Sequence, residues 1–297
     1  MNERDALRRL AADLSPAGDD AAVVDDTVIT TDMLHERTDF PPGTTRYTAG
    51  WRAVGASLSD VAAMGARATA AVAVYADERF DPDALDDFIA GATDVCTAVD
   101  ASYVGGDLDT HAEFTTATTA IGTAPADGVV RRSGAAPGDA LCVTGQWGRS
   151  AAALRLFNRE TAEATDHANE LFRFTPRVAA GRTLAETATA MMDSSDGLAR
   201  SLHQIAEASD VGVTLDGSAV PVHPAVETVT DDADEQFEMA THFGEDFELV
   251  CTLPPAAVDR ARRDCPVDLT RVGTVRAADA GVAVDGDPLE DRGYTHG

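Results

Sequence analysis

The sequence of 297 residues predicts an α/β (α+β) protein that is built from two α/β domains. Short segments of β-branched and apolar residues alternate along the chain with segments whose apolar residues recur at helical spacing. A connection punctuated by glycine and proline, RRSGAAPGD at 131–139, separates two rounds of this alternation. The length suits one large or two ordinary domains. We therefore place the boundary near residue 136 and expect domains at 1–136 and 137–297.

In the first half, a β-branched segment closed by an acid, VITTDM, predicts a strand at 28–33. The next segment, 47–64, has apolar residues three and four positions apart and is predicted to be a helix. Asp81 and Pro82 suit the N-cap and first turn of a second helix at 82–99. Further strands are expected at 70–75 and 114–123.

The second half is predicted to repeat this pattern, and its strand AMMD leads through a Ser/Asp/Gly segment into a helix. The expected strands are 140–144, 190–193, 212–215, 247–253 and 271–275, and the expected helices are 150–158, 176–187 and 198–208.

The charged residues are strongly unbalanced, with 51 acids against 23 basic residues and a net charge of −28. All 23 basic residues are Arg, and Lys is absent. P-loop NTPases and protein kinases need a Lys at the nucleotide phosphates, and pyridoxal-phosphate enzymes need one for their Schiff base, so these three classes are excluded. Nucleic-acid binding is disfavoured, because so negative a surface repels phosphate. We interpret the excess acid as an adaptation to molar salt, where charges are screened and surface carboxylates maintain solubility.

Other features indicate an ordinary intracellular protein. The four cysteines form no C-x-x-C pair, so neither a disulfide framework nor a zinc site is indicated, and we expect buried thiols. No apolar run approaches the ~20 residues of a membrane span. The charged N-terminus, MNERD, is not typical of a signal peptide. We therefore expect a cytoplasmic protein with no membrane segment.

Acidic residues alone carry little information in this chain, because its 36 Asp residues give about four Asp–Asp pairs by chance. Five segments are more specific, since they set an acid beside glycine or hydroxyl residues and leave room for a ligand. Oxygen donors of this kind suit a hard divalent cation. The segments are 18–21, 30–32, 57–60, 193–197 and 105–107, of which the last is expected to be a glycine loop.

Each segment also has a purely structural interpretation. The acids at 193–197 could cap a helix, Asp107 could belong to a turn after two glycines, and Asp60 could lie on a solvated helix face. Gly244-Glu245-Asp246 before a strand is likewise a common turn pattern. No single segment decides between ligand binding and these alternatives.

Taken together and in order, the segments match a known family. The chain resembles the thiamine-monophosphate kinases, members of the superfamily that includes aminoimidazole-ribonucleotide synthetase, from about residue 15 to the C-terminus. TTDML, DSSDGL and GEDFEL together point to this family, whereas SLSDVAAMGA and VGGD are shared with relatives. The matching motifs are GDDAAV (18–23), TTDML (30–34), SLSDVAAMGA (57–66), VGGD (104–107), RSGAAPGD (132–139), DSSDGL (193–198), GEDFEL (244–249) and RGY (292–294).

The resemblance implies transfer of the γ-phosphoryl group of ATP to thiamine monophosphate, with several Mg²⁺ ions, to give thiamine diphosphate and ADP. It also implies a homodimer joined through the sheet of the first domain, and sites in clefts between the domains. Carried over position by position, the metal ligands would be Asp20, Thr30, Thr31, Asp32, Asp60, Asp107, Asp193 and Asp196. Asp32, Asp107 and Asp196 would be catalytic, Gly106, Asp107, Arg132 and Ser195 would contact ATP, and Asp39, Glu245 and Tyr294 would hold thiamine monophosphate.

One position departs from the family pattern. Many members carry a His after TDML, near the thiamine phosphate, where HERTDFPP places Asp39 in this chain. His35 and Arg37 lie close by in the sequence and are candidates for the missing donor.

The expected chemistry agrees with the absence of Lys. Phosphoryl transfer needs mainly positioning and charge neutralisation. Six or more carboxylates would repel two polyphosphates unless Mg²⁺ ions lay between acid and phosphate. No protein nucleophile is needed, because the phosphate oxygen of thiamine monophosphate is already anionic.

Three alternatives remain at this point. The first is another ATP-using member of the superfamily, although 1–16 lacks the reactive Cys of a selenophosphate synthetase, and an aminoimidazole-ribonucleotide synthetase is longer and lacks DSSDGL. The second is a non-catalytic paralogue that binds metal and nucleotide. The third is a metal-dependent phosphatase, which product analysis separates from a kinase.

Overall fold

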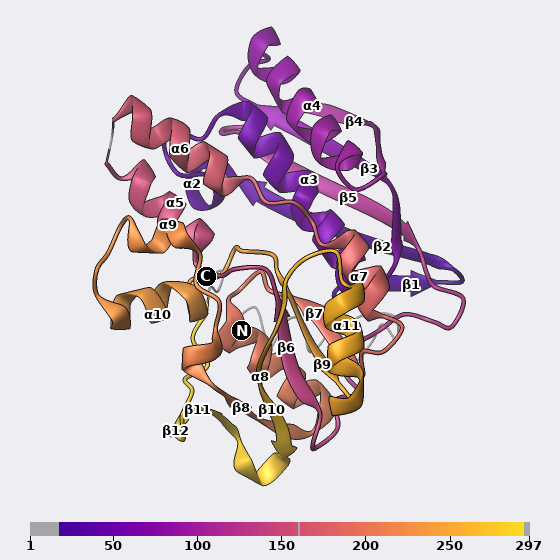
Figure 1. Cartoon of the computed structure of the whole chain (residues 1–297). Coiled ribbons are helices and arrows are strands. Elements are labelled where there is room, and N and C mark those ends of the chain that lie inside the picture. The colour runs from indigo at the N-terminus through magenta and orange to yellow at the C-terminus, as the bar shows by residue number, and fades with distance from the viewer. Residues whose placement is uncertain (1–17, 160, 294–297) are drawn as a thin grey trace.

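The computed structural model describes residues 18–159 and 161–293, and there the chain forms two β-sheets flanked by helices (Figure 1). The predicted fold class, two α/β units, is confirmed. The strands of the five-stranded sheet all precede residue 124, and those of the seven-stranded sheet all follow residue 139.

The first sheet has the strand order β1-β2-β5-β3-β4, with β3 and β4 parallel and the other neighbours antiparallel. Its strands are β1 (Ala22–Val24), β2 (Thr27–His35), β3 (Arg67–Asp77), β4 (Ser102–Thr110) and β5 (Thr115–Thr123).

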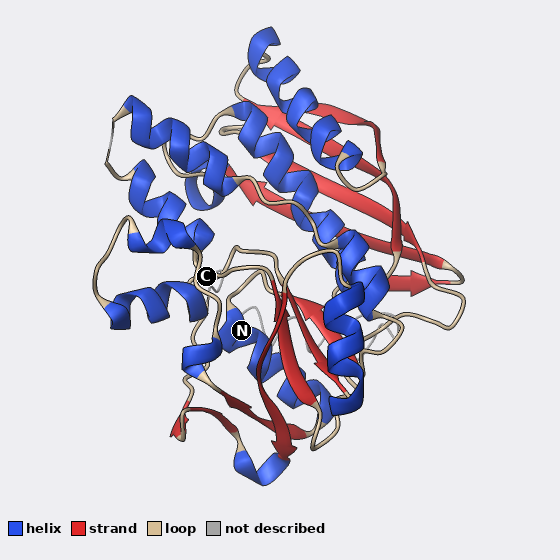
Figure 2. Cartoon of the chain, viewed as in Figure 1, coloured by secondary structure: helices blue, strands red, loops and turns tan. Residues whose placement is uncertain are grey.

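Two helices cover one face of this sheet (Figure 2). α3 (Arg46–Ala63) begins after Thr45, whose side chain accepts a backbone N–H of the first turn. α4 (Pro82–Thr97) begins after Asp81, which accepts two such N–H groups, and Pro82 occupies its first turn as predicted. These caps explain why both helices begin close to the residues expected from the sequence.

The opposite face of the first sheet, which we call the outer face, exposes apolar side chains. Because side chains alternate along a strand, Ile29 lies opposite Ile121 on this face, and Met33 lies in the same row as Val74. All four side chains are between 36 and 56% exposed. The outer face is therefore an apolar surface that remains accessible in a single chain.

The second sheet has the strand order β12-β11-β8-β10-β6-β9-β7. Its strands are β6 (Ala140–Thr144), β7 (Ala190–Asp193), β8 (Val211–Leu215), β9 (Leu249–Leu253), β10 (Leu269–Ala277), β11 (Val282–Val284) and β12 (Asp287–Pro288). The remaining α-helices are α2 (Glu36–Asp39), α5 (Arg149–Phe157), α6 (Ala162–Phe172), α7 (Val178–Leu184), α8 (Leu198–Ser209), α9 (Pro224–Glu227), α10 (Ala233–Thr241) and α11 (Val258–Asp264).

Helix α3 joins the two halves, because it packs against the first sheet and α4 on one side and against α7 on the other. The contact with α7 is backbone to backbone: a Cβ atom on Gly181 would lie 2.0 Å from the carbonyl oxygen of Ala62. Only glycine permits so close an approach. The main apolar core accordingly runs without a break from Leu58 and Met64 to Met191 in the second half.

Every strand and helix expected from the sequence has a counterpart in the structure, although several ends differ by a few residues. One expectation is wrong: residues 105–107 do not form a glycine loop but lie within strand β4. Helices α2, α6, α9, α10 and α11 were not expected, although α6 does carry apolar residues at helical spacing, Ala164, Ala168 and Phe172, which pack together.

The described chain contains no helix long and apolar enough to cross a membrane. Cys96, Cys142 and Cys251 are buried, Cys265 is half-buried, and all four are free thiols. Burial raises the pKa of each thiol, as expected of cysteines that serve as apolar core residues.

Candidate active site

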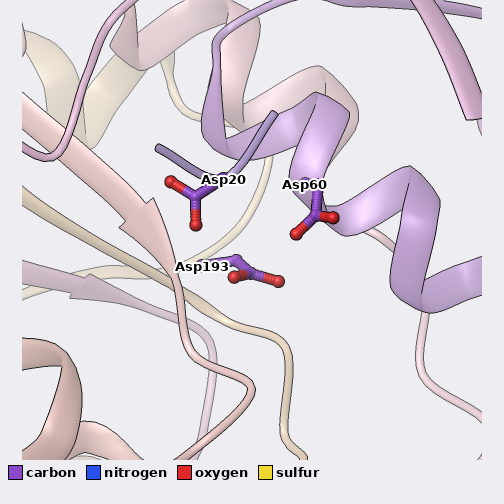
Figure 3. A group of neighbouring side chains, drawn as sticks. All are labelled: Asp20, Asp60 and Asp193. Carbon is purple, nitrogen blue, oxygen red and sulfur yellow. The ribbon is translucent and has the colours of Figure 1, made fainter. Parts of the chain in front are cut away.

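Three carboxylates meet where the two domains face each other (Figure 3). Asp20 precedes strand β1, Asp60 lies in the last turn of α3, and Asp193 is the last residue of β7. One carboxylate oxygen from each lies within 4.8 Å of the other two. We call this group the carboxylate triad.

Three anions at this spacing repel one another. Burial, followed by the charges of Asp32 and Asp193, raises the pKa of Asp60 well above its ordinary value. Burial, followed by the charge of Asp20, raises the pKa of Asp193 in the same way. A cation among the three would offset both causes, because it stabilises the ionised forms.

The oxygens of the triad also fit a divalent cation. Oδ2 of Asp20 and Oδ2 of Asp193 are buried and find no hydrogen-bond partner within the described residues. Buried oxygens without partners are costly unless something else satisfies them. Carboxylate and hydroxyl oxygens are the ligands that Mg²⁺ prefers in proteins. The triad therefore has the composition and the unpaired oxygens that suit a hard divalent cation.

Strand β2 carries two further predicted ligands, Thr30 and Asp32, and both form hydrogen bonds with residues of helix α3. The Thr30 hydroxyl donates to Oδ2 of Asp60 at 2.5 Å, and the Ser57 hydroxyl donates to Oδ2 of Asp32 at 2.6 Å. Burial is the main cause that raises the pKa of Asp32, and the charge of Glu245 adds to it. Strand alternation explains the arrangement, since Thr30 and Asp32 both face α3.

Arg132 is a basic residue in direct contact with the triad. Its Nη2 donates to Oδ1 of Asp20 at 2.7 Å, and its backbone N–H donates to Asp19 at 3.1 Å. Although burial opposes its charge, Asp20 outweighs burial and raises the pKa of Arg132. Asp19 and Ser57 were given no role from the sequence; Asp19 was hidden among the many Asp–Asp pairs.

Two motif loops lie side by side at the triad. The backbone N–H of Glu245 donates to the carbonyl oxygen of Ser195 at 2.6 Å, and that of Phe247 donates to Ser194 at 3.1 Å. Ser195 and Asp196 lie two and three residues after Asp193 and are half-buried. The DSSDGL and GEDFEL motifs, about 50 residues apart in sequence, thus form one structural unit in the second domain.

The structural interpretations left open by the sequence can now be decided. Helix α8 has Gly197 at its N-cap and no side-chain cap bond, so the acids at 193–197 do not cap it. Asp107 belongs to a strand, not to a turn. Asp60 accepts from Thr30 and faces the other acids, so it does not lie on a solvated helix face.

Two predicted ligands do not join the triad within one chain. The Thr31 hydroxyl donates to the carbonyl oxygen of Thr118 and accepts from Thr119, and strand alternation places Thr31 on the outer face. Asp107 lies opposite Val74, also on the outer face, where its carboxylate accepts from the backbone N–H of Leu108. The reason is the geometry of strands, in which neighbouring residues point to opposite faces.

Gly106 is set tightly against the neighbouring strand. A Cβ atom at this position would lie 1.6 Å from the carbonyl oxygen of Ala73, so no other residue fits. The glycine is therefore explained by close packing of β4 on β3, and its side of the sheet is the helix-covered one.

A pocket of about 600 Å³ opens between α2, α5 and α10. Asp39 and Glu245, two predicted substrate contacts, both line it. The third, Tyr294, lies outside the described residues, although the adjacent Gly293 reaches the pocket wall. The other lining residues include Phe172, Met239, Phe243 and Glu238, which make the wall partly apolar and partly acidic.

The expected donors near Asp39 are engaged elsewhere. Nδ1 of His35 shares a hydrogen bond with the Thr115 hydroxyl, and Arg37 pairs with Glu113. Asp39 itself accepts from the backbone N–H of His35 at 2.7 Å. Neither side chain therefore takes the place of the family His in this structure.

The sequence matches two family models, the AIR synthase related protein N-terminal domain over residues 18–124 and the AIR synthase related protein C-terminal domain over residues 136–286. Among curated proteins, the thiamine-monophosphate kinase of Halobacterium salinarum is 60% identical over 296 residues, which covers all of both chains. The thiamine-monophosphate kinase of Escherichia coli K12 is 32% identical and matches 94% of this chain and 90% of its own length.

Solved structures agree with these matches. A structure described as AaThiL complexed with AMPPCP and TMP has a TM-score of 0.89 and 26% identity, and covers all of this chain and 97% of its own. The thiamine-monophosphate kinase of Stenotrophomonas maltophilia has a TM-score of 0.81 and 29% identity, with 95% of each chain covered. A hydrogenase maturation protein, HypE in complex with ATP, shares the fold at a TM-score of 0.73 and 20% identity.

Proposed function

The chain belongs to the thiamine-monophosphate kinase family, and we propose that it transfers the γ-phosphoryl group of ATP to the phosphate of thiamine monophosphate, forming thiamine diphosphate and ADP. The observation that carries this proposal is the carboxylate triad, whose unpaired oxygens suit Mg²⁺. Glu245 connects it to the pocket, since it lines the pocket wall and its charge acts on Asp32.

Several Mg²⁺ ions are proposed as cofactors and ATP as co-substrate. When bound, the ions would neutralise the phosphates of both substrates and align the attacking and leaving oxygens. The proposed ligand set is Asp20, Thr30, Thr31, Asp32, Asp60, Asp107, Asp193 and Asp196. The acids of this set would hold and position the metal ions. None would act as a nucleophile, because the acceptor phosphate is already anionic.

On the nucleotide side, Arg132 is the proposed phosphate contact. Asp20 holds its guanidinium at the triad, so its positive charge is oriented before any ligand arrives. Ser195, Gly106 and Asp107 are the other proposed ATP contacts. Asp32, Asp107 and Asp196 are proposed to be catalytic, because they would hold ions that neutralise charge on the transferred phosphoryl group.

On the acceptor side, the pocket is proposed to hold the thiamine portion through Asp39, Glu245 and Tyr294. Its apolar residues suit a flat pyrimidine ring, and its carboxylates suit the positive charge of a thiazolium ring. The phosphate of the substrate would then extend from the pocket toward Asp32.

We also propose a homodimer that closes over the outer face. A second copy would cover the apolar row that contains Met33 and Val74. In the single chain these side chains are 56% and 36% exposed, respectively. Strand β1 pairs with β2 only up to Ile29 in the described chain, so the rest of β2 offers a free edge to the partner's β4. Thr31 and Asp107 lie on this face, so we propose that they act toward the partner's site.

The division into 1–136 and 137–297 and a location in the cytoplasm also remain proposals. The strand membership of the two sheets supports the first. The proposed use of ATP as co-substrate supports a location in the cytoplasm, where ATP is present.

The test is product analysis with purified protein, Mg²⁺ and molar KCl. We expect thiamine diphosphate and ADP in equal amounts, and no turnover with EDTA. An Asp60→Asn variant should lose activity, whereas Asp127→Asn, at an exposed acid outside the site, should retain it. Inorganic phosphate as the product would indicate a phosphatase, and binding of both ligands without turnover would indicate a non-catalytic paralogue.

A further inference from the structure

The backbone of residues 244–247 is held in an unusual conformation. Glu245 and Phe247 have φ angles of +64° and +53°, in the left-handed region that residues other than glycine rarely adopt. Such a conformation persists only when surrounding contacts impose it. Because Glu245 lines the pocket, the contacts that impose it also determine where its carboxylate points.

One set of contacts comes from the second domain itself. Asp246 accepts from the backbone N–H groups of Gly148 and Ser150, at 2.6 and 2.9 Å, where helix α5 begins. The Ser150 hydroxyl donates to the carbonyl oxygen of Glu245 at 2.6 Å. These bonds fix the backbone of the segment, but none of them touches the Glu245 carboxylate.

The carboxylate is held from the first domain, by Arg52 of helix α3. Arg52 is only 2% exposed, and its Nη2 donates both to the carbonyl oxygen of Glu245, at 3.0 Å, and to its carboxylate. Its Nη1 donates to the carbonyl oxygen of Phe172 at 2.7 Å. The Cζ atom of its guanidinium lies over the Phe172 ring, 3.6 Å from the ring centre. Phe172 and Glu245 both line the pocket.

The same helix reaches the metal site. Asp60 follows Arg52 by eight residues, which is about 12 Å along a helix axis. One rigid element thus carries a group that orients the pocket wall and a member of the carboxylate triad.

We propose that Arg52 is a positioning residue that fixes the Glu245 carboxylate at the pocket wall and thereby sets the affinity for the thiamine portion of the substrate. This inference rests on the proposed function for the identity of the ligand. A planar guanidinium can bind the Phe172 carbonyl and the Glu245 carboxylate at once, whereas a Lys ammonium at the same position reaches them less completely.

Steady-state kinetics of three variants tests the inference. In Arg52→Met we expect the KM for thiamine monophosphate to rise at least ten-fold, while kcat and the KM for ATP change less than three-fold. Arg52→Lys should lie between this variant and the wild type. Arg177→Met is the matched control, because Arg177 forms an equally specific pair with buried Glu248 in the same motif but does not line the pocket. It should lose thermal stability and keep its KM for thiamine monophosphate within two-fold.

A double variant shows whether Arg52 acts through Glu245. The KM for thiamine monophosphate of Arg52→Met/Glu245→Gln should be close to that of Glu245→Gln alone. The inference would be overturned if the increase in KM for thiamine monophosphate in the double variant equalled the product of the two single increases. It would also be overturned if Arg52→Met raised the KM for ATP as much as the KM for thiamine monophosphate. Hydrogen exchange in a peptide covering 242–249 supplies a readout without turnover: exchange should rise in Arg52→Met more than in Arg177→Met. If the wild type makes no thiamine diphosphate, the proposed function fails, and calorimetric binding of thiamine monophosphate together with the exchange data still decides the role of Arg52.

Discussion

Asp60 in helix α3 and Asp193 at the end of strand β7 bring carboxylate oxygens within 4.8 Å of each other, although they come from opposite sides of the domain boundary. Neither domain holds the triad alone, so the packing of α3 on the second domain is a condition for its assembly. This relationship leads to the first two predictions.

Replacing Asp60 by Asn is expected to separate stability from activity. At a pH where all three acids are ionised, the change removes one of three neighbouring negative charges, so without metal the melting temperature should rise by a few degrees, of the order expected for about 1 kcal/mol. Activity should fall by at least about 100-fold, because a proposed metal ligand is lost. Calorimetric melting with EDTA and with Mg²⁺ measures both effects. A variant that is less stable than the wild type in EDTA would contradict mutual repulsion among the acids.

The stability of the metal-free protein should decrease as the pH rises from about 4 to neutrality. Burial raises the pKa of Asp246 to about 6 and raises those of Asp60 and Asp193 as well, so the folded state binds protons more tightly than the unfolded state. Stabilisation by these protons is complete below the ordinary pKa of 3.8 and is lost through the raised values. Chemical denaturation in molar KCl with EDTA at several pH values measures this slope.

Magnesium provides the control for that slope. Since metal binding displaces protons from the triad, the apparent affinity for Mg²⁺ should increase with pH. Asp60→Asn should have a shallower slope than the wild type in EDTA. Equal slopes in the two proteins would show that surface acids, not the triad, cause the dependence.

Arg132→Met should weaken ATP binding selectively. The guanidinium is held by Asp20 at 2.7 Å, and the variant would lose the only basic side chain that contacts the triad in the described structure. We expect the KM for ATP to rise by about 10- to 100-fold, a typical effect of removing a charged phosphate contact, with a smaller change for thiamine monophosphate. Equal changes in both KM values would argue against a nucleotide role.

The proposed dimer predicts complementation between two inactive variants. If Asp107 acts in the partner's site, a mixed dimer of Asp60→Asn and Asp107→Asn chains has one intact site. Random mixing of equal amounts should then restore about one quarter of the wild-type activity. The measurement requires dissociation and reassociation of the two proteins, with light scattering to follow the dimer. Absence of any recovery in confirmed mixed dimers would place Asp107 in the site of its own chain.

Low salt is expected to destabilise the protein. The protein has a net charge of −28. The Debye length is about 3 Å at 1 M salt and about 10 Å at 0.1 M, so repulsion between its acids reaches further at the lower salt concentration. The melting temperature should therefore fall on dialysis from molar to 0.1 M KCl, by roughly 10 °C or more. Sorbitol at equal osmolarity serves as the control, since it does not screen charge. An unchanged melting temperature would refute adaptation to salt.

The sequence predicted most of the fold because its strongest elements are encoded locally. The limits of β6 and β7 coincide with their prediction, since each is a short apolar strand bounded by turn residues. Strand β4 was missed because its side chains are almost all exposed and two of its residues are glycines, so neither alternation nor β-branched residues mark it. Its glycine at 106 is required by a neighbouring strand, which local sequence does not reveal.

The site was only partly accessible from the sequence. Order and spacing of motifs led to the acids of the triad, and the structure brings Asp20, Asp60 and Asp193 together. The direction of a side chain was not accessible for Thr31, which the resemblance placed among the ligands although its strand turns it to the other face. Arg52 gave no signal, because its partner Glu245 lies 193 residues away.

The glycine at 181 has a consequence for the spacing of the carboxylate triad. Its backbone contact with Ala62 sets how closely α7 approaches α3, two residues beyond Asp60. A methyl group there would push the helix and the second domain apart, and the distance between Asp60 and Asp193 would grow with it. Gly181, which touches no member of the triad, thus helps to keep the carboxylates of the two domains within reach of one another.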